Sequence, residues 1–139
     1  MKNILITSIY LLGFITFAEA KENNHSTEIS KQEREKAAIL GLKSSPDTVL
    51  VYAKGLVCES CAIGIRKKLT RLKFIDRSKP KKGIILDAKS QLVSISVAKG
   101  KFEDISDIKK AIQGAGYDPV TLYKYTEQNE FKVIQLKNY

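Results

Sequence analysis

Cysteine, histidine, methionine and tryptophan are nearly absent from this chain. Its 139 residues include two cysteines, one histidine, no tryptophan and a single methionine at position 1. Two cysteines are too few for a small fold stapled by several disulfides, and too few for zinc, which normally takes four ligands. There is no second histidine, no acidic pair at a suitable site and no glycine-rich phosphate loop. Because no catalytic set is visible, we expect a protein that is not an enzyme.

The N-terminus has the pattern of a secretory signal peptide. Lys2 precedes a mostly apolar run over residues 4–17, and Ala18-Glu19-Ala20 gives the small-x-small pattern of a cleavage site. The run is short for a membrane span, which needs roughly 20 residues. We therefore expect residues 1–20 to be removed and the mature chain, from Lys21, to be exported, to the periplasm if the cell is Gram-negative.

Acidic residues are outnumbered by basic ones. The chain has 24 Lys and Arg against 15 Asp and Glu, a net charge of +9 at pH 7. Such an excess suits nucleic acid, an acidic membrane surface or an acidic protein partner. Export argues against nucleic acid, and we favour the interpretation that the charge forms a solvated surface that keeps the protein soluble.

The mature chain is long enough for one domain with flanking segments. Residues 21–46 form a polar extension with a predicted helix over 27–42, whose sparse apolar positions indicate that it buries little. The break at Ser44-Ser45-Pro46-Asp47 marks the domain boundary. We place the domain at residues 47–125. In the tail, 126–139, the apolar residues between 131 and 136 indicate either one more strand or a strip packed over the core.

Within the domain, the apolar pattern alternates between strand and helix periods. The order of strand, helix, strand, strand, helix, strand predicts an α+β fold of the ferredoxin-like split βαβ type (βαββαβ), an antiparallel sheet with two helices on one face. The predicted strands are 48–54, 84–87, 92–97 and 120–123. The first helix starts near Ser60 with the stripe Ala62, Ile65, Leu69 and Leu72, and the second starts at the N-cap Asp104, has the stripe Ile105, Ile108, Ile112 and Ala115, and ends at a left-handed Gly116.

Both cysteines follow the first strand and lie at the start of the first predicted helix. In this layout Cys58 ends the loop and Cys61 falls in the first turn of the helix, where backbone N–H groups favour negative charge. Basic residues at 66–68 on the same helix should also favour thiolates. Two close thiolates form a clip for a soft ion such as Cu(I) or Hg(II). The same spacing also suits a redox pair or a plain disulfide, so the pair alone leaves three interpretations.

The segment Gly55-Leu56-Val57-Cys58-Glu59-Ser60-Cys61-Ala62, with the distant Ile112-Gln113-Gly114-Ala115-Gly116-Tyr117-Asp118, resembles the heavy-metal-associated domain family. That family includes copper chaperones, the N-terminal modules of metal-transporting ATPases and exported mercury-binding proteins. The resemblance covers roughly residues 48–125. It implies that Cys58 and Cys61 are the metal ligands and that Tyr117 faces the site, shielding the metal or hydrogen-bonding near the sulfurs. Leu56 stands where the family usually has a methionine that packs under the loop.

We therefore expect an exported protein that holds one soft metal ion, Cu(I) or Hg(II), between Cys58 and Cys61. It would pass the ion by ligand exchange to a partner such as a metal-transporting membrane protein. The alternatives are a thiol–disulfide oxidoreductase and an interaction module with a local disulfide. A thioredoxin-type enzyme would have an aromatic residue at Val57 and a cis-proline facing the pair, for which Pro119 is the weak candidate. We expect Glu59 to be solvated and His25 to be exposed and without a role.

Overall fold

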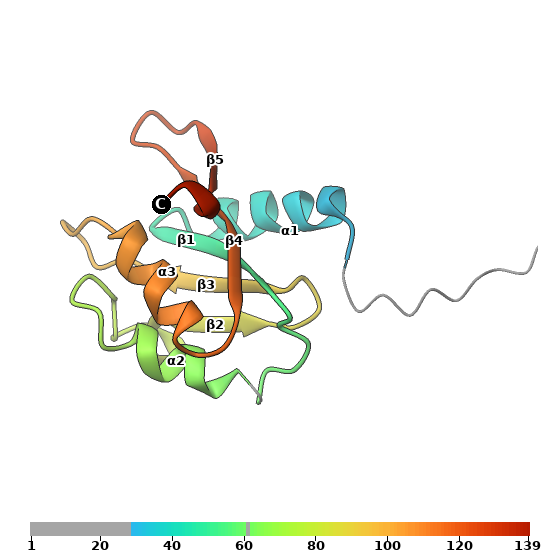
Figure 1. The fold of residues 1–139 in the computed structure, drawn as a ribbon. Coiled ribbons are helices and arrows are strands. Elements are labelled where there is room, and N and C mark those ends of the chain that lie inside the picture. The colour runs from blue at the N-terminus through green and yellow to red at the C-terminus, as the bar shows by residue number, and fades with distance from the viewer. Residues whose placement is uncertain (1–28, 61) are drawn as a thin grey trace, which may run out of the picture.

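The protein is a five-stranded antiparallel sheet with helices on both faces (Figure 1). The computed structural model describes residues 29–60 and 62–139, so the predicted signal peptide and His25 lie outside the described residues. None of the helices in the described part of the chain is long and apolar enough to cross a membrane. The helices are α1 (Lys31–Ser44), α2 (Ile63–Leu69) and α3 (Ile105–Gln113), with short 3-10 turns at Pro80–Gly83 and Leu136–Asn138. The strands are β1 (Thr48–Lys54), β2 (Ile84–Asp87), β3 (Leu92–Ser96), β4 (Asp118–Tyr125) and β5 (Phe131–Gln135).

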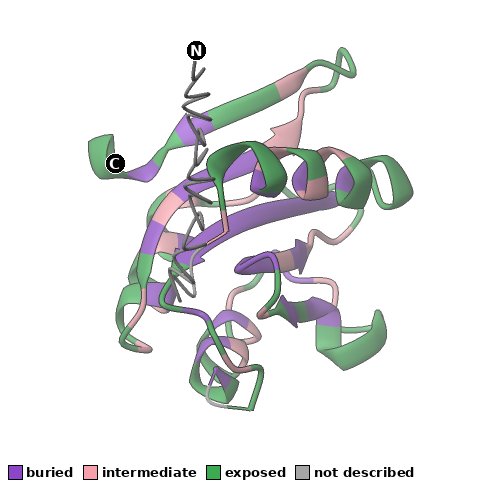
Figure 2. Ribbon diagram, turned by 90° about the vertical axis from the view of Figure 1, so that its right-hand side faces the viewer, coloured by how far each residue is buried: buried purple, intermediate pink, exposed green. Residues whose placement is uncertain are grey.

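The strands are arranged in the order β2-β3-β1-β4-β5, and every neighbouring pair is antiparallel. β1 is central and buried along nearly its whole length, which Figure 2 shows as a continuous buried strand. The predicted succession of strands and helices between β1 and β4 is confirmed, and so is the α+β class. The tail agrees with both of its predictions, because β5 pairs with β4 at the edge of the sheet and Ile134 and Leu136 are buried in the core.

One face of the sheet is covered by α2 and α3, which also pack against each other. The predicted apolar stripes of both helices point into this core, where Ile65, Leu69, Ile108 and Ile112 are fully buried. The predicted cap of α3 is also confirmed, since Asp107 N donates to the Asp104 carboxylate at 2.9 Å. Burying an aliphatic side chain of this size stabilises the fold by about 1.5–3 kcal/mol.

The opposite face is covered by α1, and the prediction that this helix buries little is wrong. Ala38 and Leu42 are fully buried against Leu50, Tyr52, Leu92 and Tyr123 of the sheet. Arg34, one turn before Ala38, is also buried, with its guanidinium carbon 3.4 Å from the centre of the Tyr52 ring. The buried stripe therefore includes an arginine that lies over an aromatic ring. A count of apolar residues alone does not include this contact.

Candidate metal centre

The loop after β1 is held by a glycine turn and a buried leucine. Gly55 has φ +87, the left-handed region that glycine adopts without strain. Leu56 N then donates to Ala53 O at 3.2 Å, and the Leu56 side chain is fully buried in the core between the sheet, α2 and α3. Val57 points outward and is 55% exposed. The predicted role of Leu56, packing beneath the loop, agrees with this burial.

Cys58 follows in a partly exposed position. Its sulfur lies 3.1 Å from the Ser60 hydroxyl, and its carbonyl accepts a hydrogen bond from Ala62 N at 3.2 Å. Cys61 lies outside the described residues. Helix α2 starts at Ile63, with Ala62 as its N-cap, three residues after the predicted start near Ser60. The prediction that Cys61 falls in the first turn concerns a residue that the structure does not describe.

The first N–H groups of α2 are largely engaged by the loop that precedes them. Ala62 N donates to Cys58 O, Ile63 N to Ser60 O at 3.4 Å, and Ile65 N to Ala62 O at 2.9 Å. These three N–H groups are therefore not unpaired, whereas the sequence-based interpretation took the N–H groups at this helix start to be unpaired. The turn satisfies these groups with backbone carbonyls, as loops before short helices do.

The basic residues of α2 are also directed elsewhere. Arg66 Nε donates to Ile84 O of β2 at 3.2 Å. The Lys68 ammonium lies over Gly114 at the end of α3, where an added Cβ would come within 3.4 Å of it. A cation suits that place, because carbonyls at a helix C-terminus carry partial negative charge. These contacts hold the Arg66 side chain at β2 and the Lys68 side chain at the end of α3.

A lysine from another segment contacts this loop, and the sequence analysis did not predict this contact. Lys81 forms an ion pair with Glu59 at 3.8 Å, and both side chains are about half exposed. Lys81 comes from the segment Arg77–Gly83, which we call the basic connector. The contact brings that segment beside the cysteine loop, residues 55–60. Glu59 is exposed, as expected, but it is paired.

The predicted corner after α3 lies beside the start of α2. Gly116 has φ +90, its N–H donates to Gln113 O at 2.9 Å, and Tyr117 N donates to Ile112 O at 3.3 Å. These two bonds form a Schellman motif, so the predicted left-handed cap at Gly116 is confirmed. A Cβ added to Gly64 of α2 would lie 3.8 Å from the Ala115 side chain, so the corner packs closely on the helix start.

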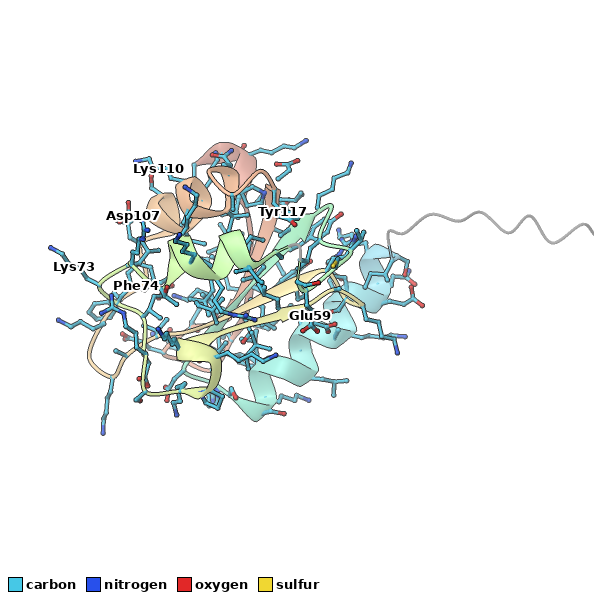
Figure 3. All side chains as sticks on the ribbon, turned by 90° about the horizontal axis from the view of Figure 1, so that it is seen from below. Glu59, Lys73, Phe74, Asp107, Lys110 and Tyr117 are labelled. Atoms are coloured by element: carbon cyan, nitrogen blue, oxygen red, sulfur yellow. The ribbon has the colours of Figure 1, made fainter. Side chains whose placement is uncertain are left out.

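Tyr117 is half buried and packs on the edge of the core between the sheet, α2 and α3. Figures 1 and 3 show the corner at the same end of the helix pair as the cysteine loop, with Tyr117 and Glu59 on that side. The structure thus brings together three of the four predicted site residues, Leu56, Cys58 and Tyr117, at one end of the domain. The fourth, Cys61, is the one outside the described residues.

Other ligand groups are not gathered near this loop. Residues 29–60 and 62–139 contain no group of three or more His, Cys, Asp or Glu side chains placed to hold a metal ion. Comparison of the chain with protein-family models, with curated proteins and with solved structures found no match.

Proposed function

We propose that this chain is an exported carrier of one soft metal ion, Cu(I) or Hg(II), held between Cys58 and Cys61. The observation that carries the proposal is the arrangement of the cysteine loop. It follows the central strand, rests on a fully buried Leu56, and has the Gly114–Tyr117 corner packed against the helix that follows it. Two thiolates in such a loop offer a soft ion the ligands it prefers.

The fold supports the same proposal. We infer a ferredoxin-like split βαβ arrangement between β1 and β4, supported by the element order, the sheet order β2-β3-β1-β4 and the position of α2 and α3 on one face. Helix α1 and strand β5 are additions to it. Together with the sequence resemblance, this arrangement of strands and helices favours membership of the heavy-metal-associated family, to which copper chaperones and exported mercury-binding proteins belong.

Transfer would proceed by ligand exchange, with the metal ion as cargo. A thiolate of the receiving protein forms a new bond to the ion, one cysteine–metal bond breaks, and that sulfur leaves as a thiolate. A second exchange completes the transfer, and no electron changes hands. The partial exposure of Cys58 gives an incoming sulfur access, and Ser60 Oγ, 3.1 Å away, can hydrogen-bond the released sulfur. The receiving protein we propose is a metal-transporting membrane protein.

Titration of the reduced, metal-free protein under anaerobic conditions tests the proposal. With Cu(I) or Hg(II) and a competing chelator, we expect one equivalent to bind to the wild type and none of that affinity to remain in the Cys58→Ser, Cys61→Ser double variant. Ser60→Ala is the matched control, because it alters the same loop and keeps both thiols. Equal affinity of the wild type and the double variant would refute metal binding by this pair.

The redox alternative has less support. Every peptide bond in the described residues is trans, that of Pro119 included, and Pro119 is paired with Ala53 inside the sheet. Pro119 is therefore not the cis-proline expected to face the cysteine pair of a thioredoxin-type enzyme. Measuring the reduction potential and the disulfide-reductase activity separates the two functions: an oxidising potential with turnover favours the oxidoreductase, and a strongly reducing potential without turnover eliminates it.

A further inference from the structure

Nearly all of the net charge of this protein comes from one short segment. Residues 66–82 contain nine of the 24 Lys and Arg and one of the 15 Asp and Glu. The rest of the chain, with 15 basic and 14 acidic residues, is close to neutral. The segment runs through most of α2 and through the basic connector. Whether it forms one surface depends on how these two pieces lie.

Three contacts hold the basic connector alongside α2. At the C-terminal end of the helix, Arg77 Nε donates to Thr70 O at 2.7 Å. Near the middle, Arg66 Nε reaches Ile84 O, immediately after the connector. At the other end, Lys81 meets Glu59 in the cysteine loop. Helix and connector therefore form one surface, which we call the basic face, with the exposed cations Lys67, Arg71, Lys73, Arg77, Lys79, Lys81 and Lys82. Figure 3 shows Lys73 extending outward at the end away from Glu59.

The backbone of the connector is strained at two of these lysines. Lys81 and Lys82 have φ values of 51 and 57, in the left-handed region, and both side chains are exposed. Two consecutive non-glycine residues in this conformation cost free energy and persist only where the surrounding structure fixes them. The contact that fixes the connector is the close approach of Gly83 to Asp76. A Cβ added to Gly83 would lie 2.4 Å from Asp76 O.

The end of the basic face at the cysteine loop has an apolar edge. Val57 is 55% exposed and Ile63 is 56% exposed. Ile63 lies on the same side of α2 as Lys67, which follows four residues later. Apolar side chains beside a row of lysines and arginines are the combination that settles at a lipid surface, with the apolar groups below the headgroups and the cations among them.

We propose that the basic face binds the surface of a membrane rich in anionic phospholipid. The charge of the segment complements such a surface, and Val57 and Ile63 add contact with the lipid interior. This orientation places the cysteine loop against the membrane, where a membrane-embedded partner would be reached by diffusion in two dimensions. Membrane binding needs no metal, so it can be tested independently of the proposed metal-carrying function.

Sedimentation with lipid vesicles tests the proposal. The protein is used as processed on export, with its N-terminus read by mass spectrometry, reduced and metal-free. Vesicles of phosphatidylcholine containing about one third phosphatidylglycerol are compared with vesicles of phosphatidylcholine alone. Because each cation near an anionic surface changes the partition coefficient about fivefold, Lys67→Gln, Lys79→Gln and Lys82→Gln together should weaken binding by about 100-fold. High salt should abolish most of the wild-type binding.

A matched variant separates the basic face from net charge in general. Lys43→Gln, Lys132→Gln and Lys137→Gln remove the same charge from α1, β5 and the C-terminal turn, and should weaken binding by less than threefold. Val57→Ser with Ile63→Ser should lower the part of the binding that survives high salt. Circular dichroism establishes that each variant is folded.

Three results would overturn the proposal. One is binding that does not depend on phosphatidylglycerol, and another is an equal loss in both triple variants. The third is binding to soluble polyglutamate without binding to the vesicles, which would assign the face to an acidic protein instead.

Discussion

Gly83 should be far more costly to replace than Gly55, although both have a positive φ. Gly83 has φ +77 and Gly55 has φ +87. Placing alanine in this conformation costs about 1–2 kcal/mol, and restricting the unfolded chain offsets about 0.4–1 kcal/mol of that. Gly55 has open space where a Cβ would go, so Gly55→Ala should cost about 1 kcal/mol in the free energy of unfolding.

At Gly83 a steric term is added. A Cβ would lie 2.4 Å from Asp76 O, below the 3.0 Å that real Cβ contacts reach. The backbone cannot easily yield, because Asp76 N is hydrogen-bonded to Ser96 O at 2.9 Å. Overpacking of this kind costs about 1–3 kcal/mol, so Gly83→Ala should lose about 3 kcal/mol in all.

Urea unfolding followed by circular dichroism measures both variants, with the cysteines reduced and metal removed so that only the glycines differ. A loss of about 3 kcal/mol lowers the midpoint by at least about 1 M. If Gly83→Ala is no less stable than Gly55→Ala, the close approach of the connector to Asp76 is wrong, and the geometry of the basic face with it.

Three further predictions concern stability. Leu56→Met should cost less than about 1.5 kcal/mol in unfolding free energy and leave metal affinity unchanged, whereas Leu56→Ala should cost about 2–5 kcal/mol; equal losses would contradict the burial of this side chain. Asp104→Ala should destabilise by about 1 kcal/mol through loss of the α3 cap, and unaltered stability would show that the cap is not formed in solution. Hydrogen bonds from the Ser78 hydroxyl and N–H lower the pKa of Asp76, so their stabilisation is present at neutral pH and is lost as the pH falls through that pKa. Asp76→Asn should therefore show a weaker loss of stability on acidification, measured by thermal unfolding across pH, and an acid profile identical to that of wild type would refute this.

Local sequence signals were enough to predict most of the sheet. The ends of β1 and β2 match the predicted ranges, because β-branched and apolar runs there are bounded by turn residues. Gly116 was identified because a left-handed cap requires a residue without a side chain. Each of these features depends on residues that are close in the chain.

Features that depend on distant contacts were not predictable in this way. The burial of α1 relies on Arg34 covering Tyr52, which a pattern of apolar residues does not contain. Arg66 seemed placed to assist the cysteines, but a carbonyl on β2 takes its hydrogen bond. The pairing of Lys81 with Glu59 follows from the path of the connector, which only the folded structure defines. In the candidate site, then, the sequence identified the residues of the loop and corner, and the structure assigned the charges around them.

The central claim is that the two cysteine sulfurs bind the metal ion. X-ray absorption spectroscopy of the exported, reduced protein loaded with one equivalent of Hg(II) or Cu(I) tests it most directly, because it identifies the atoms bonded to the metal. We predict a first shell of two sulfurs in the wild type, unchanged in Ser60→Ala, and loss of sulfur from that shell in Cys58→Ser and in Cys61→Ser. A shell of nitrogen and oxygen atoms, or a shell that both cysteine variants leave unchanged, would contradict it.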